Sequence, residues 1–186
     1  MQVTVTEAAR RQQIVDAAIE VIAEHGYAQA SFARIVAHAG LSSTRLISYH
    51  FKNKGDLDMA VLIAALGQVD ELVNARLDGV TDRVEMVRVY IAAQVELLHT
   101  HREQIRVLRE VAAGAPDLAV VLHEFRVGRL QRQFTQGQRE GVFGGFDPAI
   151  MAGTVAAGID AAADSDIDPD TYAHELVELF TRAIRA

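Results

Sequence analysis

The chain has 186 residues, of which half are hydrophobic and none is cysteine. This length and apolar content suffice for a globular core, and the lack of cysteine excludes disulfides, thiolate metal sites and cysteine nucleophiles. The longest unbroken apolar run, Met59 to Leu66, covers eight residues, whereas a membrane-spanning helix needs about 20. We therefore expect no membrane segment. Because the first residues carry no long apolar stretch, we also expect no signal peptide and a cytoplasmic location.

The net charge of −7 argues against a nucleic-acid partner, but the distribution of charge favours one. Residues 1–55 carry six bases and four acids, a net charge of +2, and the rest of the chain carries −9. No acidic residue occurs between His25 and Gly55. This asymmetry indicates a basic contact surface on an acidic body. The alternative is that chance alone leaves so short a window without acids.

Helical spacing of apolar residues runs through nearly the whole chain, which predicts an all-α fold. In the first helix this spacing relates Ile14, Ala18, Val21, Ile22 and His25. Thr4 to Glu7 have the spacing of a capping box just before it, and Gly26 closes it. Two short helices follow, at about 32–39 after the cap Ser31 and at about 43–50. Asn53 then caps a long fourth helix.

Caps and prolines mark the remaining helices. Asp82 caps a helix that reaches about Thr100, and another helix covers about 102–113. Pro116, Pro148 and Pro169 each occupy the first position of a predicted helix, where proline is favoured. About nine helices result, and the body of the protein resembles a helical bundle.

Residues 26–54 combine the features of a helix-turn-helix motif. Two short helices meet at a tight turn in which Gly40 can take a positive φ. A small shared core joins them, formed by Phe32, Ile35, Val36, Leu41, Leu46 and Ile47. In such a motif the second helix enters the DNA major groove and its first side chains face base edges.

The side chains of this segment suit DNA. Arg45 can donate two hydrogen bonds to a guanine edge, and a helix N-terminus at Ser31 attracts phosphate. Serine and threonine contact bases or phosphates, Tyr49 and His50 suit phosphate oxygens, and the other bases add charge without sequence information. The candidate DNA-binding residues are Ser31, Arg34, Ser42, Ser43, Thr44, Arg45, Ser48, Tyr49, His50, Lys52 and Lys54.

The stretch IVDAAIEVIAEHGYAQASFARIVAHAGLSSTRLISYHFKNKGDLDMAVL resembles the DNA-binding region of TetR-family transcriptional regulators. The resemblance covers about residues 10–62 and rests on the IVAHAGLS turn and the YHFKNKGDL segment in their expected order. It implies a helix-turn-helix DNA-binding domain of three helices at residues 1–54 and a helical ligand-binding and dimerisation domain at residues 55–186. It further implies a homodimeric repressor or activator that a small effector releases from DNA. The two-fold symmetry predicts a palindromic operator.

Two departures from the family pattern lie in the recognition segment. From Gly40 to Phe51 the chain is one residue longer than usual, and the extra residue falls within Ser42 to Arg45. Two adjacent registers for the base contacts therefore stay open. Ser48 stands where the family often has an aromatic residue, so either Tyr49 takes that place or the helix packs differently.

The effector pocket has to be inferred from the body itself. The helix at 82–100 is apolar on more than one face, which indicates a central position. Phe125 and Arg129 share an apolar stripe of the helix that begins at Pro116. We expect a mostly apolar pocket with few polar groups, and the alternative is that these are ordinary residues at the edge of the core. The candidate ligand-binding residues are Met86, Tyr90, Gln94, Phe125 and Arg129.

The last two helices carry the candidate dimer interface. Ala149, Gly153, Ala157 and Ala161 are spaced by four and form a flat strip that permits close helix packing. Leu176 and Phe180 belong to a second stripe on the final helix. The resemblance implies that two such helices from each subunit form the interface, although a monomer could bury the same stripes internally.

No catalytic constellation or metal site is predicted. Asp164 to Glu175 have the spacing of a calcium loop, but Pro169 stands where the sharp turn requires glycine. The sequence shows no phosphate loop, nucleophile elbow or zinc-protease motif. We therefore expect neither an enzyme nor a cofactor. The alternative function is that of a helical small-molecule-binding or scaffold protein without specific DNA recognition, against which the acid-free window argues.

Overall fold

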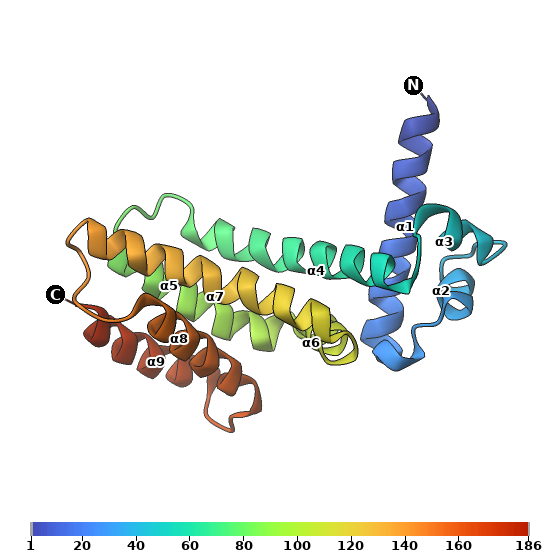
Figure 1. Cartoon of the computed structure of the whole chain (residues 1–186). Helices are drawn as coiled ribbons and strands as arrows, with labels where there is room; N and C mark the ends of the chain where they lie inside the picture. The colour runs from blue at the N-terminus through green and yellow to red at the C-terminus, as the bar shows by residue number, and fades with distance from the viewer. Residues whose placement is uncertain (1, 186) are drawn as a thin grey trace. The chain divides into compact units, whose positions relative to one another are not determined.

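A computed structural model describes residues 2–185, and within this range the chain is helical and contains no β-strand (Figure 1). The all-α prediction is confirmed. The nine α-helices of the described range are α1 Gln2–His25, α2 Phe32–His38, α3 Arg45–His50, α4 Lys54–Leu77, α5 Arg83–Thr100, α6 Arg102–Gly114, α7 Pro116–Arg139, α8 Pro148–Ala161 and α9 Pro169–Ile184. Two short 3₁₀-helices, η1 Tyr27–Gln29 and η2 Ala162–Asp164, join them.

The predicted helix starts are largely confirmed. The side chains of Ser31, Asp82, Asp147 and Asp168 each accept a hydrogen bond from a backbone N–H of the first turn, and Asn53 does so for Asp56 at 2.9 Å. The three prolines each open a helix. The predicted capping box at Thr4 is wrong, because α1 begins at Gln2 and contains Thr4. Alanine and arginine, both strong helix formers, follow and favour a longer helix.

Contacts divide the chain into two compact units. The N-terminal unit comprises the residues up to Gln68 together with Glu103–Val120, and the C-terminal unit comprises Val69–Arg102 together with the residues from Val121 onward. The helices α4 and α7 therefore contribute residues to both. The functional division between residues 54 and 55 is drawn on other grounds and stays a prediction.

The N-terminal unit packs α2 and α3 around a buried side of α1. Ile14 and Ile22 of α1, Ile35 of α2, and Ile47 of α3 are at most 1% exposed. Gly40 has a φ of +64° as predicted. In the turn, Leu41 N donates to Val36 O at 2.9 Å and Gly40 N to Ala37 O at 3.3 Å. This pair of bonds is a Schellman motif, which ends α2 sharply.

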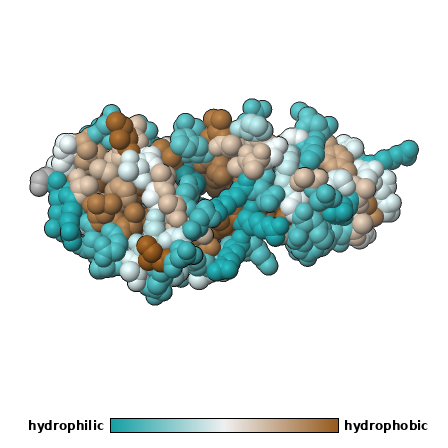
Figure 2. Space-filling view, turned by 90° about the horizontal axis from the view of Figure 1, so that it is seen from below, coloured by the Kyte–Doolittle hydropathy of each residue, from teal (hydrophilic) through white to brown (hydrophobic). Residues whose placement is uncertain are grey.

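Within the C-terminal unit, α5 is the central helix. It packs against α9 and α8 and buries side chains on several sides, as its apolar pattern predicted: Val87, Tyr90, Ile91, Ala93, Val95 and Leu97. Apolar side chains also reach the molecular surface among hydrophilic ones (Figure 2). None of the described helices has the length and apolar content needed to cross a membrane.

Candidate nucleic-acid interface and effector pocket

The recognition segment consists of a turn followed by the short helix α3. Because α3 begins at Arg45, Ser42 and Ser43 belong to the preceding turn, and the helix is two residues shorter at its start than predicted. The first backbone bonds of the segment run from Leu46 N to Ser43 O at 3.1 Å and from Ile47 N to Thr44 O at 3.0 Å. The helix α3 therefore has six residues, and the two registers for the base contacts stay open.

One face of α3 is open to solvent. Arg45, Ser48 and Tyr49 on the helix and Thr44 just before it are exposed, whereas Ile47 is fully buried. Thr44 and Ser48, like Arg45 and Tyr49, are four residues apart and so occupy the same side of a helix. Ser42 is exposed in the turn, and His50 is partly buried. The face therefore presents hydroxyl groups, one guanidinium and one phenol.

Several predicted contact residues are already engaged within the N-terminal unit. The Ser31 hydroxyl accepts from Arg34 N at 3.3 Å, and the Ser43 hydroxyl accepts from Arg45 N at 3.2 Å. Tyr49 is 70% exposed and donates to Glu7 Oε1 at 2.8 Å. This hydrogen bond, with the charge of Glu7, raises the pKa of the Tyr49 hydroxyl. Tyr49 thus ties α3 to α1 while it remains accessible.

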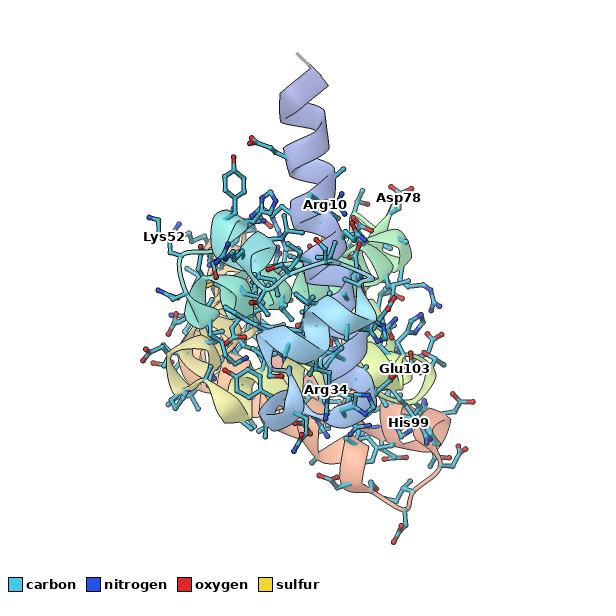
Figure 3. The ribbon with its side chains drawn as sticks, turned by 90° about the vertical axis from the view of Figure 1, so that its right-hand side faces the viewer. Arg10, Arg34, Lys52, Asp78, His99 and Glu103 are labelled. Carbon is cyan, nitrogen blue, oxygen red and sulfur yellow. The ribbon has the colours of Figure 1, made fainter. Side chains whose placement is uncertain are left out.

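The basic residues of the acid-free window fall into two groups. Arg34, Arg45 and Lys52 are exposed and form no ion pair within residues 2–185; Figure 3 labels Arg34 on α2 and Lys52 on the segment after α3. Lys54 differs, because its Nζ lies 3.1 Å from Asp58 Oδ1 and 4.3 Å from the centroid of the Tyr27 ring. Three of the four charges are therefore free to meet an external anion.

The C-terminal unit contains a cavity of about 220 Å³ between α4, α5, α7 and the segment after α7. Its apolar lining comes from Leu77, Met86, Val87, Leu130 and Phe143. Its polar groups come from as many residues, namely Asn74, Arg83, Tyr90, Arg129 and Gln133. This composition suits a small molecule that is largely apolar with one or two polar groups.

Both arginines of the cavity are neutralised by carboxylates. Arg129 bonds to Asp70, and its Nη2 donates to Asn74 Oδ1 at 2.7 Å. Arg83 donates to Glu140 at 2.5 and 2.8 Å and to Gln133 Oε1 at 2.8 Å. The Arg83 hydrogen bond lowers the pKa of Glu140 to about 2. The cavity therefore carries fixed dipoles and little free charge.

Tyr90 is the buried polar group of the cavity. Its ring is 7% exposed, and burial raises the pKa of its hydroxyl, which is therefore neutral. No hydrogen-bond partner for this hydroxyl occurs among the described residues. No buried polar atom of the described side chains lacks a partner, so the Tyr90 hydroxyl is open to the cavity that Tyr90 lines and is available to a polar atom of a ligand.

The structure brings three of the five predicted ligand residues together. Met86, Tyr90 and Arg129 line the cavity, whereas Gln94 and Phe125 do not, and Phe125 is 41% exposed. Sequence reasoning missed the residues of α4 and the segment after α7. No sequence pattern marked Leu77 and Phe143 as cavity residues, because their positions depend on contacts between distant parts of the chain.

The predicted dimer residues separate into two groups. Ala149, Ala157 and Ala161 of α8 are exposed and Gly153 is partly so. Leu176 and Phe180 of α9 are instead 9% and 5% exposed. Both pack within the chain beside Gly158, where an added Cβ would lie 2.9 Å from Leu176 Cδ1 and 3.5 Å from Phe180 Cε2. The small-residue strip of α8 is thus open, and the α9 pair belongs to the core.

In the described range no three histidine or acidic residues gather as a metal site would require.

The comparison with protein families decides the identity of the N-terminal region. Residues 14–61 match the model described as bacterial regulatory proteins, tetR family. By this match, which covers 48 of the 186 residues, the N-terminal region is similar to that of the tetR family. The match spans α2, α3 and most of the buried side of α1, which are the elements that carry the exposed face described above.

Two curated proteins are similar to this chain. The fatty acid metabolism regulator protein of Bacillus subtilis is 28% identical over 154 residues, which is 80% of this chain and 72% of that protein. The transcriptional regulator BetI of Serratia proteamaculans is 36% identical over 73 residues, which is 39% of this chain and 36% of that protein. The similarity to BetI is therefore confined to part of both chains.

Solved structures share the fold over nearly the whole length. AibR in complex with isovaleryl coenzyme A and operator DNA has a TM-score of 0.69 at 18% identity and covers 91% of this chain and 97% of its own. A TetR-family transcriptional regulator from Haemophilus influenzae has a TM-score of 0.74 at 18% identity and covers 97% of this chain and 99% of its own. At these identities the likeness concerns the fold alone.

Proposed function

We propose that this protein is a ligand-responsive transcriptional regulator that binds operator DNA through α2, α3 and their flanking turns. The observation that carries the proposal is the open face of α3, which presents Arg45 and Ser48. In the same unit Arg34 of α2 and Lys52 after α3 are exposed and form no ion pair among the described residues. An exposed helix of a helix-turn-helix motif with hydrogen-bonding side chains is suited to the major groove. Unpaired cations near it supply the attraction to phosphate.

The proposed contacts divide into base readout and backbone positioning. Arg45 donates to a guanine edge, and Thr44 and Ser48 contact bases from the same face. Ser42, Tyr49 and His50 reach phosphate oxygens, as does the α2 N-terminus at Ser31. Ser43 contributes to DNA binding only indirectly, because its hydroxyl accepts a hydrogen bond from Arg45 N at 3.2 Å. Arg34 and Lys52 add charge.

The proposed regulation is release from DNA by an effector that binds the cavity of the C-terminal unit. Its apolar lining and the neutral Tyr90 hydroxyl suit an apolar or amphipathic compound. The relatives named as a fatty acid metabolism regulator and as a complex with isovaleryl coenzyme A give the first compounds to try. Short acyl-CoA thioesters and free fatty acids are therefore the first probes. The proposed role is that of a repressor.

The protein is proposed to act as a homodimer on a palindromic operator. The exposed strip of Ala149, Gly153, Ala157 and Ala161 supports this, since small side chains let two helices approach closely. Leu176 and Phe180 back this surface from within the protomer. Light scattering of the purified protein tests the assembly: Ala157→Arg is expected to yield monomers, and Ala113→Arg, an exposed alanine of α6, to leave the wild-type mass unchanged.

The central experiment is an anisotropy titration against labelled DNA from the region flanking the gene, with a scrambled duplex as control, at about 50 and 200 mM salt. A preference of about a thousandfold or more for the genomic duplex supports the proposal. Where no preference is found, a selection from random-sequence DNA follows. Failure to enrich any sequence would overturn the proposal in favour of a helical ligand-binding protein without specific DNA recognition.

A further inference from the structure

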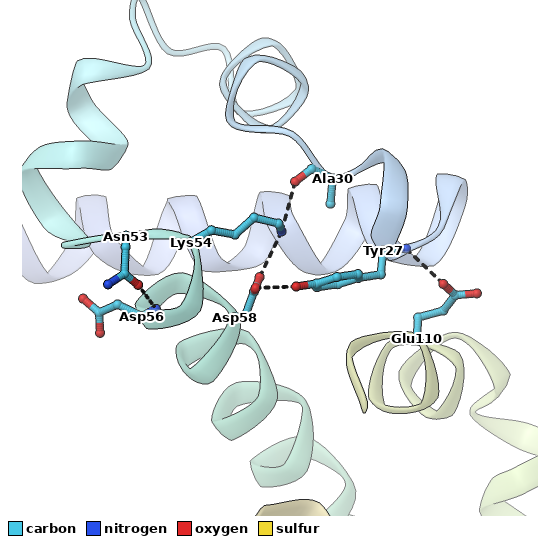
Figure 4. A network of polar contacts seen from close by, with 7 residues as sticks. All are labelled: Tyr27, Ala30, Asn53, Lys54, Asp56, Asp58 and Glu110. Carbon is cyan, nitrogen blue, oxygen red and sulfur yellow. Dashed lines mark hydrogen bonds and ion pairs between the residues drawn. The ribbon is translucent and has the colours of Figure 1, made fainter. Parts of the chain in front are cut away.

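The segment that joins α1 to α2 is held by side chains from two other helices (Figure 4). Tyr27 N donates to Glu110 Oε2 of α6 at 3.0 Å. The Tyr27 hydroxyl donates to Asp58 Oδ2 of α4 at 2.6 Å. Lys54 Nζ of α4 donates to Ala30 O at 3.4 Å. All of these residues belong to the N-terminal unit.

The ammonium group of Lys54 has partners within the N-terminal unit, although the Lys54 side chain is 42% exposed. It bonds to Asp58 Oδ1 at 3.1 Å and to Ala30 O, and it lies 4.3 Å from the centroid of the Tyr27 ring. An ammonium has three N–H donors, and three neighbours match them. The Asp58 side chain is 5% exposed, and a carboxylate so buried requires its counter-charge.

Lys52 provides the contrast two residues earlier. It is exposed and forms no ion pair in the part of the chain that the structure describes. Lys52 is therefore free to neutralise a phosphate, whereas a phosphate bound by Lys54 would have to compete with a buried carboxylate. The two lysines of the chain thus differ in their surroundings although only one residue separates them in sequence.

Tight packing fixes the position of Tyr27. A Cβ on Gly114 of α6 would lie 1.9 Å from Tyr27 Cδ1, so the ring rests directly against that glycine. Gly26 has a φ of +82°, and a Cβ there would lie 3.3 Å from Glu110 Oε2. The Tyr27 ring and backbone are therefore both seated on α6, and the segment has little freedom to move.

We infer that Lys54 is a positioning residue of the DNA-binding motif and not a phosphate contact. With Asp58 and Tyr27, it fixes Ala30, which immediately precedes Ser31, the cap of α2. Since α2 and α3 share a buried core through Ile35 and Ile47, the start of α2 sets the placement of α3. This inference rests on the proposed function.

The test compares salt dependence and sequence preference in the full-length protein. Lys54→Met with Asp58→Asn removes both charges, keeps an apolar stem over the Tyr27 ring and leaves an acceptor for its hydroxyl. Lys52→Met is the matched control. Each variant is titrated by anisotropy against the selected operator and a scrambled duplex over a range of salt. Tyr27→Phe removes the hydroxyl alone and carries the test if the double variant does not fold by circular dichroism.

The double variant is expected to lose about tenfold or more in operator affinity, as for a mismatched contact. Its affinity for the scrambled duplex and its salt slope should stay those of the wild type. Lys52→Met should instead lower the slope by about 0.9 on both duplexes, as expected for one lost phosphate contact. Tyr27→Phe should weaken operator preference without a change of slope.

A salt slope lowered by about 0.9 in the double variant would overturn the inference, because it would show that Lys54 contacts phosphate. The inference would also be overturned if the double variant bound both duplexes as the wild type does. A gain in affinity for both duplexes by Asp58→Asn alone would overturn it as well. A wild-type protein that prefers no sequence overturns the proposed function itself. The two failures are thus distinguishable.

Discussion

The two units of the molecule use arginine and lysine in opposite ways. In the N-terminal unit Arg34, Arg45 and Lys52 are exposed and unpaired among the residues that the structure describes. In the C-terminal unit six arginines each form an ion pair with a carboxylate: Arg76, Arg83, Arg88, Arg126, Arg129 and Arg182. A polyanion requires free cations, whereas a largely apolar cavity tolerates only neutralised ones. The pairing of basic residues is therefore a better guide to function here than their number.

The units are alike in their use of glycine. Gly114 in the N-terminal unit lies under the Tyr27 ring, and Gly137 in the C-terminal unit lies under the Phe143 ring, where an added Cβ would approach to 1.9 and 2.1 Å. In both units a glycine on a helix therefore receives an aromatic side chain from a neighbouring turn.

The largest effect is expected for Gly137→Ala. An added Cβ would lie 2.1 and 2.2 Å from two carbons of the Phe143 ring, which is 4% exposed and packs on Phe134 with 6.0 Å between ring centroids. Overpacking of this kind costs about 1–3 kcal/mol, and we expect the upper end in urea unfolding. Gly128→Ala on the same helix meets only the flexible end of Arg132 at 3.4 Å and should be neutral or stabilising. Equal stability of the two variants would contradict the packing described.

Arg45→Ala tests the free charges of the N-terminal unit. Loss of a bidentate contact to guanine is expected to cost about 1–3 kcal/mol of operator binding, roughly tenfold to a hundredfold, and to relax preference at one base pair. The measurement is an anisotropy titration against operators substituted at single positions. Arg139→Ala, an exposed arginine of α7 in the C-terminal unit, is the control and should bind as the wild type. A uniform loss on every duplex would assign Arg45 to phosphate instead.

Gln133→Leu tests the polar lining of the cavity. Gln133 lines the cavity and accepts from Arg83 at 2.8 Å, so its loss leaves a donor of Arg83 without that partner and should change effector affinity by about threefold to tenfold. Release of labelled operator by isovaleryl-CoA or by the most effective fatty acid reports this affinity. Gln94→Leu on α5 is the control, because Gln94 does not line the cavity. A larger effect at Gln94 would move the effector site elsewhere.

The smallest effect concerns the Arg83 to Glu140 pair at low pH. Arg83 lowers the pKa of Glu140 from 4.5 to about 2. The stabilisation is therefore complete above pH 4.5 and is lost as the pH falls through 2. In Glu140→Gln the urea midpoint should depend less steeply on pH between these two values. Glu71→Gln, at an exposed position of α4, should keep the wild-type curve, and identical curves for all three proteins would contradict the pairing.

Local features could be predicted from the sequence, because they depend on neighbouring residues. The caps Ser31 and Asp82 and the positive φ of Gly40 are set within one helical turn and were predicted correctly. The central place of α5 also followed from its apolar faces. The order of motifs around the IVAHAGLS turn was specific enough to indicate the family.

The other features of the fold and of the candidate sites depend on tertiary contacts, which a local sequence pattern cannot predict. Asp58 meets Tyr27 across 31 residues, and Glu110 meets the same residue across 83. The sequence pattern also could not tell which stripe of α9 faces inward, so Leu176 and Phe180 were assigned to a dimer surface although they pack beside Gly158. Phe143 reaches the cavity only because Gly137 leaves room for its ring.

The shortness of α3 limits how much of an operator one copy of the chain can read. Six residues from Arg45 to His50 make a helix about 9 Å long at 1.5 Å per residue. A helix of that length faces about three base pairs of a duplex that rises 3.4 Å per step. A sequence of so few base pairs recurs by chance throughout a genome. If the protein acts as the proposed homodimer, the distance between its two half-sites must supply much of the remaining discrimination. Recognition of the operator would then depend on the spacing of the half-sites as much as on their base sequence.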